Sequence, residues 1–369
     1  FIASFFLITT GLFYTFYGLL EASPGWSKQG QLLVFWPIIF TFLIPMFSTK
    51  NSWKLVNINL FISSILIFIF SIYLIFIELN IINDLGLKNL LPNLKTGISL
   101  NESGIELGWP GFNSLPFLIP FVLCYSVLRN NFSNEFRINN IIVLLALLSI
   151  LVVSVISGRR ALLLILFSSF LTLLFFSYFL PSNKFKNALK NLLIFVSIPI
   201  PLVIFILIYF QIDLFLVYEN FVEGFQFNDL SNVSANRRTI QLNALINGWS
   251  EVPLIGAGLG SHVDYIRSWD MPWSYELFYL AFLYQVGFLG FLIYSLGILW
   301  IVMESIKIIR LGNNNSFQII CLLCGMFGAL IASITNPYLL RFDGLWVIFI
   351  PAAFINYHFI KFQNENHNL

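Results

Sequence analysis

The sequence predicts an all-α, polytopic integral membrane protein with about ten transmembrane helices. Its 369 residues are 58% hydrophobic and only 10% charged, whereas a soluble domain carries about 25% charged residues. Apolar runs long enough to cross a bilayer, about 17–25 residues, recur along the whole chain. The basic residues are unevenly divided between alternate loops, which is the charge pattern of a multi-pass protein.

The apolar runs define ten predicted spans within one polytopic membrane domain, residues 1–369. The fourth span contains Pro116 and Pro120 and is expected to be kinked or re-entrant. Because residue 1 is Phe and no cleavable signal peptide is visible, we expect an incomplete N-terminus, with room for further spans before it. The ten spans are residues 1–20, 31–47, 55–78, 114–128, 138–157, 161–180, 191–213, 277–303, 317–335 and 344–360.

The charges of the loops predict the orientation. One alternate set, residues 48–54, 129–137, 181–190, 304–316 and the C-terminal tail, holds ten basic and three acidic residues, and the other set holds nine basic and fourteen acidic residues. Cytoplasmic loops are enriched in Lys and Arg. We therefore expect a bacterial inner-membrane protein with both termini in the cytoplasm. The longest loop, residues 214–276 between the seventh and eighth spans, is then periplasmic.

Six of the nine arginines fall on the outer side, against this bias. An arginine kept at a membrane against the topological signal is a functional candidate. Its planar guanidinium binds phosphate oxygens through a fork of N–H donors. The pattern predicts a phosphate-bearing substrate at the outer surface of the bilayer. The six residues are Arg159, Arg160, Arg237, Arg238, Arg267 and Arg341.

Several classes of function are disfavoured. No basic block of five or more residues exists, so we expect no nucleic-acid partner. The cytoplasmic loops contain no glycine-rich nucleotide loop and no carboxylate pair suited to a metal, so we expect neither cofactor nor metal. Cys124, Cys321 and Cys324 all lie within apolar spans, where small-residue packing is favoured over disulfide, redox or metal chemistry.

The 214–276 loop is expected to contain short amphipathic helices. Residues 214–230 have an apolar face typical of a helix in the membrane interface, or they extend the preceding span. Residues 236–249 (NRRTIQLNALINGW) predict a helix capped by Ser234 or Asn236. Arg237 and Arg238 in its first turn oppose the helix dipole unless they bind an anion there. The alternative is that they pair with nearby acids or lipid headgroups.

Three further features belong to the outer side. Arg159 and Arg160 lie in a very short turn, where binding of the substrate phosphate and contact with lipid phosphate are both open. Arg341 could complete the cluster or pair with Asp343. The glycine-rich stretch formed by Gly256, Gly258 and Gly260 is a weak motif without a P-loop ending. We interpret it as a tight turn that returns the loop to the membrane.

Acid–base candidates gather just before the eighth span. Glu276 is the first choice as general base, because a carboxylate at the edge of lipid is costly and poorly solvated. A salt bridge to an outer arginine is the structural alternative. Asp264, Asp270 and His262 follow as candidates. For His262 a role as a polar loop residue is favoured over a catalytic one.

Four segments in this order resemble the O-antigen polymerase and ligase superfamily: SGRRALL (157–163), NRRTIQLNALINGWSEVPLIGAGLG (236–260), WSYELFYLAFLYQVGFLG (273–290) and TNPYLLRFDG (335–344). The resemblance implies that Arg160 and Arg237 or Arg238 hold a diphosphate, and it maps the family's glycine-rich stretch to residues 256–260. The family's loop motif usually has Trp where this chain has Gln241. Ligases usually carry His where Tyr275 and Glu276 stand here, which favours the polymerase.

The resemblance implies a metal-independent glycosyltransferase of cell-envelope, lipopolysaccharide-like polysaccharide biosynthesis. Its donor is an oligosaccharide on a polyprenyl (undecaprenyl) diphosphate carrier, and its setting is membrane lipid. A chain-length regulator protein is an implied partner. Two alternatives stay open: an O-antigen ligase that transfers the glycan to another acceptor, and a flippase or transporter of lipid-linked oligosaccharides. The charge-poor spans weigh against transport.

Overall fold

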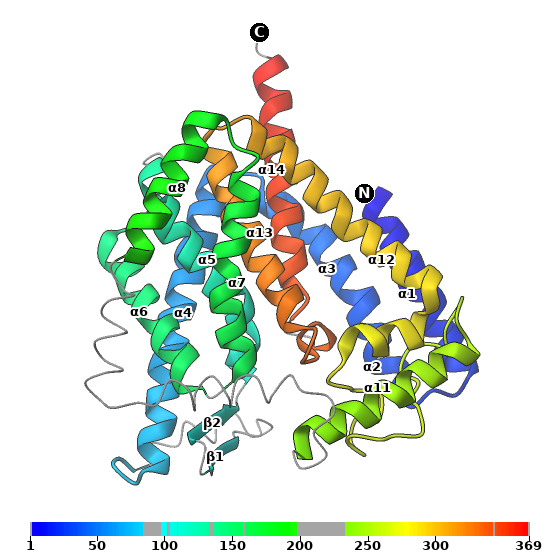
Figure 1. Cartoon of the computed structure of the whole chain (residues 1–369). Helices are drawn as coiled ribbons and strands as arrows, with labels where there is room; N and C mark the ends of the chain where they lie inside the picture. The colour runs from blue at the N-terminus through cyan, green and yellow to red at the C-terminus, as the bar shows by residue number, and fades with distance from the viewer. Residues whose placement is uncertain are drawn as a thin grey trace. The chain divides into compact units, whose positions relative to one another are not determined.

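The described part of the protein is built from helices and a small β-hairpin (Figure 1). The computed structural model describes residues 2–83, 97–101, 104–108, 110–132, 136–157, 159–197, 233–341 and 344–367. Their longer helices are α1 (Ile2–Leu20), α3 (Trp36–Leu43), α4 (Lys50–Glu78), α5 (Leu115–Leu128), α6 (Asn140–Ile156), α7 (Arg160–Ser177), α8 (Ser182–Ser197), α11 (Val233–Glu251), α12 (Phe278–Arg310), α13 (Asn314–Ala332) and α14 (Trp346–His367).

The hairpin is the one departure from the predicted all-α class among the described residues. Strand β1 (Gly97–Asn101) pairs antiparallel with β2 (Gly104–Gly108), so that Ile98 lies opposite Leu107 and Leu100 opposite Ile105. The helical class of the protein is unchanged by this short hairpin, which lies in a segment predicted only as a loop.

Five helices in the described part of the chain are long and apolar enough to cross a membrane. They are Trp26–Phe47, Lys50–Glu78, Gly111–Asn131, Phe278–Arg310 and Asn314–Ala332. The first joins α2 (Trp26–Gly30), a π-helical turn (Gln31–Phe35), α3 and a 3₁₀ turn (Ile44–Phe47). Four shorter apolar helices cover Phe5–Leu20, Asn140–Ser154, Ala161–Ser177 and Trp346–Lys361. Each overlaps a predicted span. The predicted span 191–213 lies largely outside the described residues.

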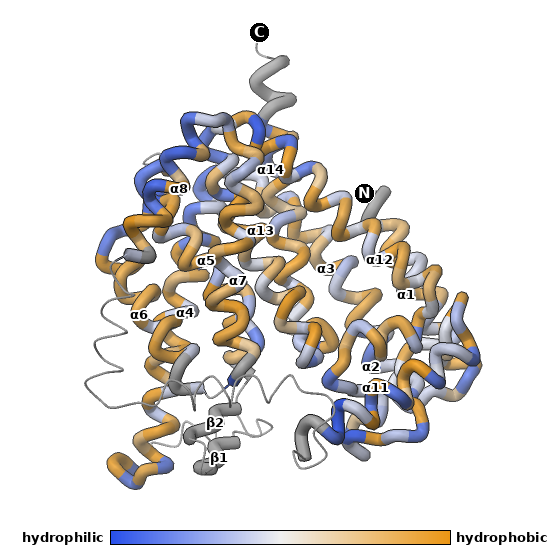
Figure 2. Tube along the Cα trace, in the orientation of Figure 1, coloured by the Kyte–Doolittle hydropathy of each residue, from blue (hydrophilic) through white to orange (hydrophobic). Residues whose placement is uncertain are grey.

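Apolar side chains also cover the outer faces of these helices. Figure 2 colours most of α4 and α12 as hydrophobic, whereas α11 mixes hydrophobic and hydrophilic residues. Leu66 on α4 and Leu296 on α12 are 57% and 52% exposed. Water would penalise so much exposed apolar surface, whereas lipid would not. The helices are thus compatible with a multi-pass membrane protein.

The chain divides into two compact units, of which one comprises Met46–Phe185, Ser305–Ala332 and Ile350–Leu369. Its centre is the contact between α5 and α13, two helices whose residues are mostly buried. A Cβ added at Gly325 would lie 2.8 Å from the Phe117 ring, and one at Gly328 would overlap the Pro116 carbonyl oxygen. The absence of these side chains allows the two helices to approach closely.

The same unit buries one reciprocal amide pair. Asn57 Nδ2 donates to Gln318 Oε1 over 3.0 Å, and Gln318 Nε2 donates to Asn57 Oδ1 over 2.8 Å. Both side chains are fully buried. Since each amide offers the donor and acceptor that the other needs, α4 and α13 are fixed in register at this point without an unpaired polar group.

The other unit comprises Phe1–Pro45, Lys186–Glu304 and Ser333–Phe349, and it contains a broken helix. Within α12, Gly287 adopts φ 63° and ψ −176°, a backbone conformation essentially confined to glycine. In an unbroken helix, the carbonyls of Tyr284 and Gln285 would accept hydrogen bonds from the N–H groups of Phe288 and Leu289. The break separates these four groups, and each needs a new partner.

The loop after α11 supplies all four partners. The N–H groups of Ala257 and Gly258 donate to the carbonyls of residues 284 and 285, each over 2.9 Å. The carbonyls of Pro253 and Leu254 accept from the N–H groups of residues 288 and 289 over 2.9 and 3.1 Å. A break in an apolar helix is stable only when its backbone groups are paired. Segment 253–258 therefore connects the two halves of α12 through these four hydrogen bonds.

The three glycines of this loop are required by backbone conformation and by space. Gly256, Gly258 and Gly260 have φ values of 80°, 86° and 79°, the left-handed region that favours glycine. A Cβ at Gly258 would lie 2.7 Å from the Cα of Gly18 at the end of α1. A Cβ at Gly256 would overlap the backbone N of Gly287. The loop is wedged between α12 and α1, a more specific role than the tight turn predicted from sequence.

Candidate functional site

Helix α11 positions the central arginine. Arg238, Gln241 and Leu245 are spaced by three and four residues and share one face. Leu245 is fully buried in a cluster with Val263 and Tyr275, and Gln241 is 1% exposed. This apolar anchor turns the same face of the helix, and Arg238 with it, toward the following loop. The neighbouring residue Arg237 lies outside this face and is exposed.

The start of α11 differs from the prediction. The helix begins at Val233, so Ser234 and Asn236 lie inside it and neither caps it. Arg237 and Arg238 are its fifth and sixth residues, beyond the first turn in which free N–H groups point at an anion. The argument that these arginines share the helix N-terminus with a phosphate is therefore wrong. The predicted end is right, because α11 stops at Glu251, just before Pro253.

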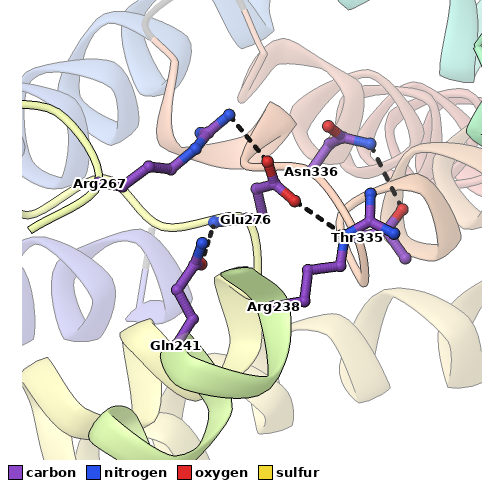
Figure 3. A network of polar contacts seen from close by, with 6 residues as sticks. All are labelled: Arg238, Gln241, Arg267, Glu276, Thr335 and Asn336. Atoms are coloured by element: carbon purple, nitrogen blue, oxygen red, sulfur yellow. Dashed lines mark hydrogen bonds and ion pairs between the residues drawn. The ribbon is translucent and has the colours of Figure 1, made fainter. Parts of the chain in front are cut away.

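Glu276 joins two arginines from separate segments (Figure 3). Nε of Arg238 donates to its Oε2 over 2.8 Å, and Nη2 of Arg267 lies 3.0 Å from its Oε1. The backbone N–H of Glu276 donates to Oε1 of Gln241 over 3.0 Å. Two guanidinium groups that are 29 positions apart in the chain thus meet at one carboxylate. We name Arg238, Arg267, Glu276 and Gln241 the arginine–carboxylate network.

The network carries excess positive charge and is open to solvent. The side chains of Arg238, Arg267 and Glu276 are 21%, 40% and 19% exposed. Each partly exposed pair contributes on the order of 0–1 kcal/mol to stability, so its geometry matters more than its strength. Two cations and one carboxylate leave a net charge of +1. This arrangement can bind an anion with several acceptor oxygens, such as a phosphate group.

The segment before α14 places two more polar side chains near the network. Figure 3 draws Thr335 and Asn336 with the network, and Asn336 Nδ2 donates to Thr335 Oγ1 over 3.4 Å. Arg341 follows a short 3₁₀ turn, Tyr338–Leu340, and is exposed. Its predicted partner Asp343 lies outside the described residues. The choice between pairing with Asp343 and joining the arginine cluster stays a prediction.

Tyr275, next to Glu276, is a structural residue of the loop. It is fully buried, and its hydroxyl accepts a hydrogen bond from the backbone N–H of Val263 over 3.0 Å. Burial raises the pKa of Tyr275 to about 12, against the smaller lowering effect of the Val263 hydrogen bond. Tyr275 therefore stays protonated at neutral pH and fixes the backbone on one side of Glu276.

The other acid–base candidates have different surroundings. His262 is partly buried, with Nδ1 3.0 Å from the Val263 carbonyl oxygen. Because a carbonyl only accepts, this contact places the proton on Nδ1 and leaves Nε2 as the basic nitrogen. The backbone carbonyl of His262 also accepts from the Tyr284 hydroxyl over 3.1 Å. Asp264 and Asp270 are exposed.

The arginines of the short turn lie in the other compact unit. Arg159 comes just before α7, and its guanidinium carbon lies 5.1 Å from the centre of the Phe112 ring, a cation–π distance. Arg160 is the first residue of α7, and its side chain is outside the described part of the structure. The predicted convergence of these two residues with Arg238 remains a prediction.

Three further features considered in the sequence analysis are the amphipathic segment, a metal site and the cysteines. The amphipathic segment 214–230 lies outside the described residues. Within the described residues, no group of three His, Cys, Asp or Glu side chains is placed to hold a metal ion. Cys124, Cys321 and Cys324 are buried, free thiols.

Two members of the network were missed as such from the sequence. Arg267 was recognised only as one of six outer arginines, and Gln241 only as a departure from a family motif. The signal for Gln241 was its helical phase, three residues after Arg238 and four before Leu245. No local signal paired Arg267 with Glu276, because that contact depends on the path of the whole loop.

These features define a helical protein that is compatible with a multi-pass membrane protein and that has an arginine–carboxylate network in the segments before α12. Comparisons with protein-family models, with curated proteins and with solved structures found no match to this chain.

Proposed function

We propose that the protein is a polysaccharide polymerase of the O-antigen type. It would transfer a glycan from a polyprenyl diphosphate carrier to a second lipid-linked repeat unit at the periplasmic face of the inner membrane. About ten membrane crossings, cytoplasmic termini and a periplasmic 214–276 loop belong to this proposal. The observation that carries it is the meeting of Arg238 and Arg267 at one two-oxygen anionic group.

The chemistry follows from that meeting. Neither nucleotide sugars nor ATP are supplied outside the inner membrane, so the donor must arrive activated, and a lipid-linked diphosphate is such a donor. When the bond from the anomeric carbon to the diphosphate oxygen breaks, negative charge grows on the diphosphate. Fixed guanidinium groups stabilise this charge without a metal. The six outer arginines are the candidates for these guanidinium groups. Arg238 and Arg267 are the first candidates, and Arg159, Arg160, Arg237 and Arg341 are further ones.

The acceptor hydroxyl needs a base. Its oxygen forms a bond to the anomeric carbon while the carbon–diphosphate bond breaks, and its proton passes to the base. Glu276 remains the first candidate because it lies at the arginine pair. Both of its oxygens contact arginines in this structure, so it must leave these ion pairs to take the proton of the acceptor hydroxyl. His262, with its basic Nε2, and Asp264 are the alternatives.

The test is a purified reaction. The protein in lipid nanodiscs receives lipid-linked repeat units and no other acceptor. A polymerase yields a ladder of longer lipid-linked glycans and free polyprenyl diphosphate. A ligase leaves the repeat units unchanged until a separate acceptor lipid is added, and the ladder does not form. Repeat units that move across the bilayer with no change in length would instead identify a transporter and refute the proposal.

A further inference from the structure

The Glu276 carboxylate occupies the position that a phosphate group would take between the two arginines. Its two oxygens lie 2.8 and 3.0 Å from nitrogens of Arg238 and Arg267. We propose that Glu276 is an exchangeable internal occupant of this arginine pair, and that the donor's diphosphate displaces it on binding. The inference rests on the proposed function and adds a regulation of the same site.

The geometry of the ion pairs suits exchange. Arg238 reaches the carboxylate through Nε and Arg267 through a single Nη2. Each carboxylate oxygen faces a different arginine, so the two arginines share one carboxylate instead of each holding it through a parallel two-bond fork. The three side chains are 21%, 40% and 19% exposed. An incoming anion can therefore reach both guanidinium groups and replace contacts that each cost little to break.

Charge favours the incoming group. One carboxylate leaves the arginine pair with a net charge of +1, whereas the diphosphate of a sugar-linked polyprenyl diphosphate carries two negative charges and neutralises both guanidinium groups. Once the diphosphate is bound, Glu276 becomes a third negative charge beside it. Repulsion at this short range moves the carboxylate away from the arginines. Binding of the donor and release of Glu276 are thus coupled.

The main chain holds Glu276 in place while its side chain moves. Its backbone N–H is bound by the Oε1 of Gln241, which is 1% exposed. Tyr275 before it is fully buried, and Leu277 after it is 7% exposed. A displaced carboxylate therefore stays within reach of the site, free of its arginine contacts. The exchange releases the Glu276 side chain only when donor is present.

The direction of one affinity change tests the exchange. Binding of farnesyl diphosphate to the full chain in nanodiscs is measured for the wild type, for Glu276→Gln and for Glu251→Gln. Glu251 is exposed at the end of α11, so its replacement removes the same charge outside the network. We expect Glu276→Gln to bind about tenfold more tightly, because an internal competitor is lost. Glu251→Gln should stay within about twofold of the wild type.

Equal or weaker binding by Glu276→Gln, with an unchanged thermal unfolding temperature, would overturn the exchange, because the carboxylate would then hold the arginines in place for the ligand. If Glu276→Gln unfolds more easily, adding inorganic pyrophosphate should restore its stability more than it stabilises the wild type. The absence of that difference would also overturn the exchange. Failure of the proposed function looks different: no diphosphate binds the wild type, and Arg238→Gln changes nothing.

Discussion

Helices α12 and α13 are both apolar and membrane-length, yet they are built differently. Helix α13 is uninterrupted and mostly buried, whereas α12 has few buried residues and breaks at Gly287. Both helices contain glycines, but these glycines have different structural roles. Gly325 and Gly328 of α13 give room for α5, while Gly287 of α12 supplies a backbone conformation that other residues rarely adopt. Hydropathy detects both helices and does not distinguish them.

The difference shows where the site gets its rigidity. The packing of α13 is provided by neighbouring helices, and its polar residue Gln318 is paired within the core. The break in α12 is held by the loop that follows α11, the helix that carries Arg238. The arginine–carboxylate network and the break are thus two ends of one connected segment. Damage to the break should reach the network, and damage to α13 should spare it.

The largest effect is expected at the break itself. Gly287→Ala would place a Cβ in overlap with the Leu254 carbonyl oxygen at a φ of 63°, and it should destabilise the protein by about 2–4 kcal/mol. Gly297→Ala is the matched control, because its Cβ would meet only the Leu7 side chain at 3.7 Å. It should be neutral or stabilise α12 by about 0.5–1 kcal/mol. Thermal unfolding in detergent measures both, and equal effects would contradict the hydrogen-bonded connection of the two halves of α12.

A change in α13 sharpens the comparison. Gly328→Ala would overlap the Pro116 carbonyl oxygen and should cost about 1–3 kcal/mol by overpacking the contact with α5. Its effect should be confined to that contact. Limited proteolysis of the loop 253–260 should be unchanged in Gly328→Ala and faster in Gly287→Ala. Faster cleavage in both variants would show that the two helices are not independent.

The amide pair of α4 and α13 gives a smaller, more defined effect. Asn57→Leu leaves the buried Gln318 amide without its partner and should destabilise the protein by about 1–3 kcal/mol. Adding Gln318→Leu removes the orphaned amide, so the double variant should be more stable than the sum of the single changes predicts. Additive losses in the cycle would mean that the two amides do not interact.

The sequence predicted the helices better than their interruptions. The lengths of the apolar runs place α4, α5, α12 and α13, because apolar length is what a bilayer selects. The break at Gly287 was missed, since one glycine in an apolar run is also compatible with an intact helix. The sequence did contain a signal for the hairpin. Apolar residues alternate with polar ones in Ile98-Ser99-Leu100 and in Ile105-Glu106-Leu107, but this segment was considered only as a loop.

The site was predictable in composition and only partly in geometry. Helical phase on α11 could have separated Arg238 from Arg237, because Leu245 marks the buried face. The contact of Glu276 with an arginine was one of two interpretations of that carboxylate, and the structure has it with two arginines. The partner Arg267 could not be identified, since the path of the loop is set by tertiary backbone contacts such as those of segment 253–258.

The most direct test of the central claim compares two adjacent arginines. Arg238→Lys and Arg237→Lys keep the charge and remove the guanidinium, and only Arg238 belongs to the network. With lipid-linked repeat units in nanodiscs, Arg238→Lys should lower the rate of polymer formation by about 10²-fold, and Arg237→Lys should stay within about threefold of the wild type. Equal rates for the two variants, or a larger loss at Arg237, would contradict the account.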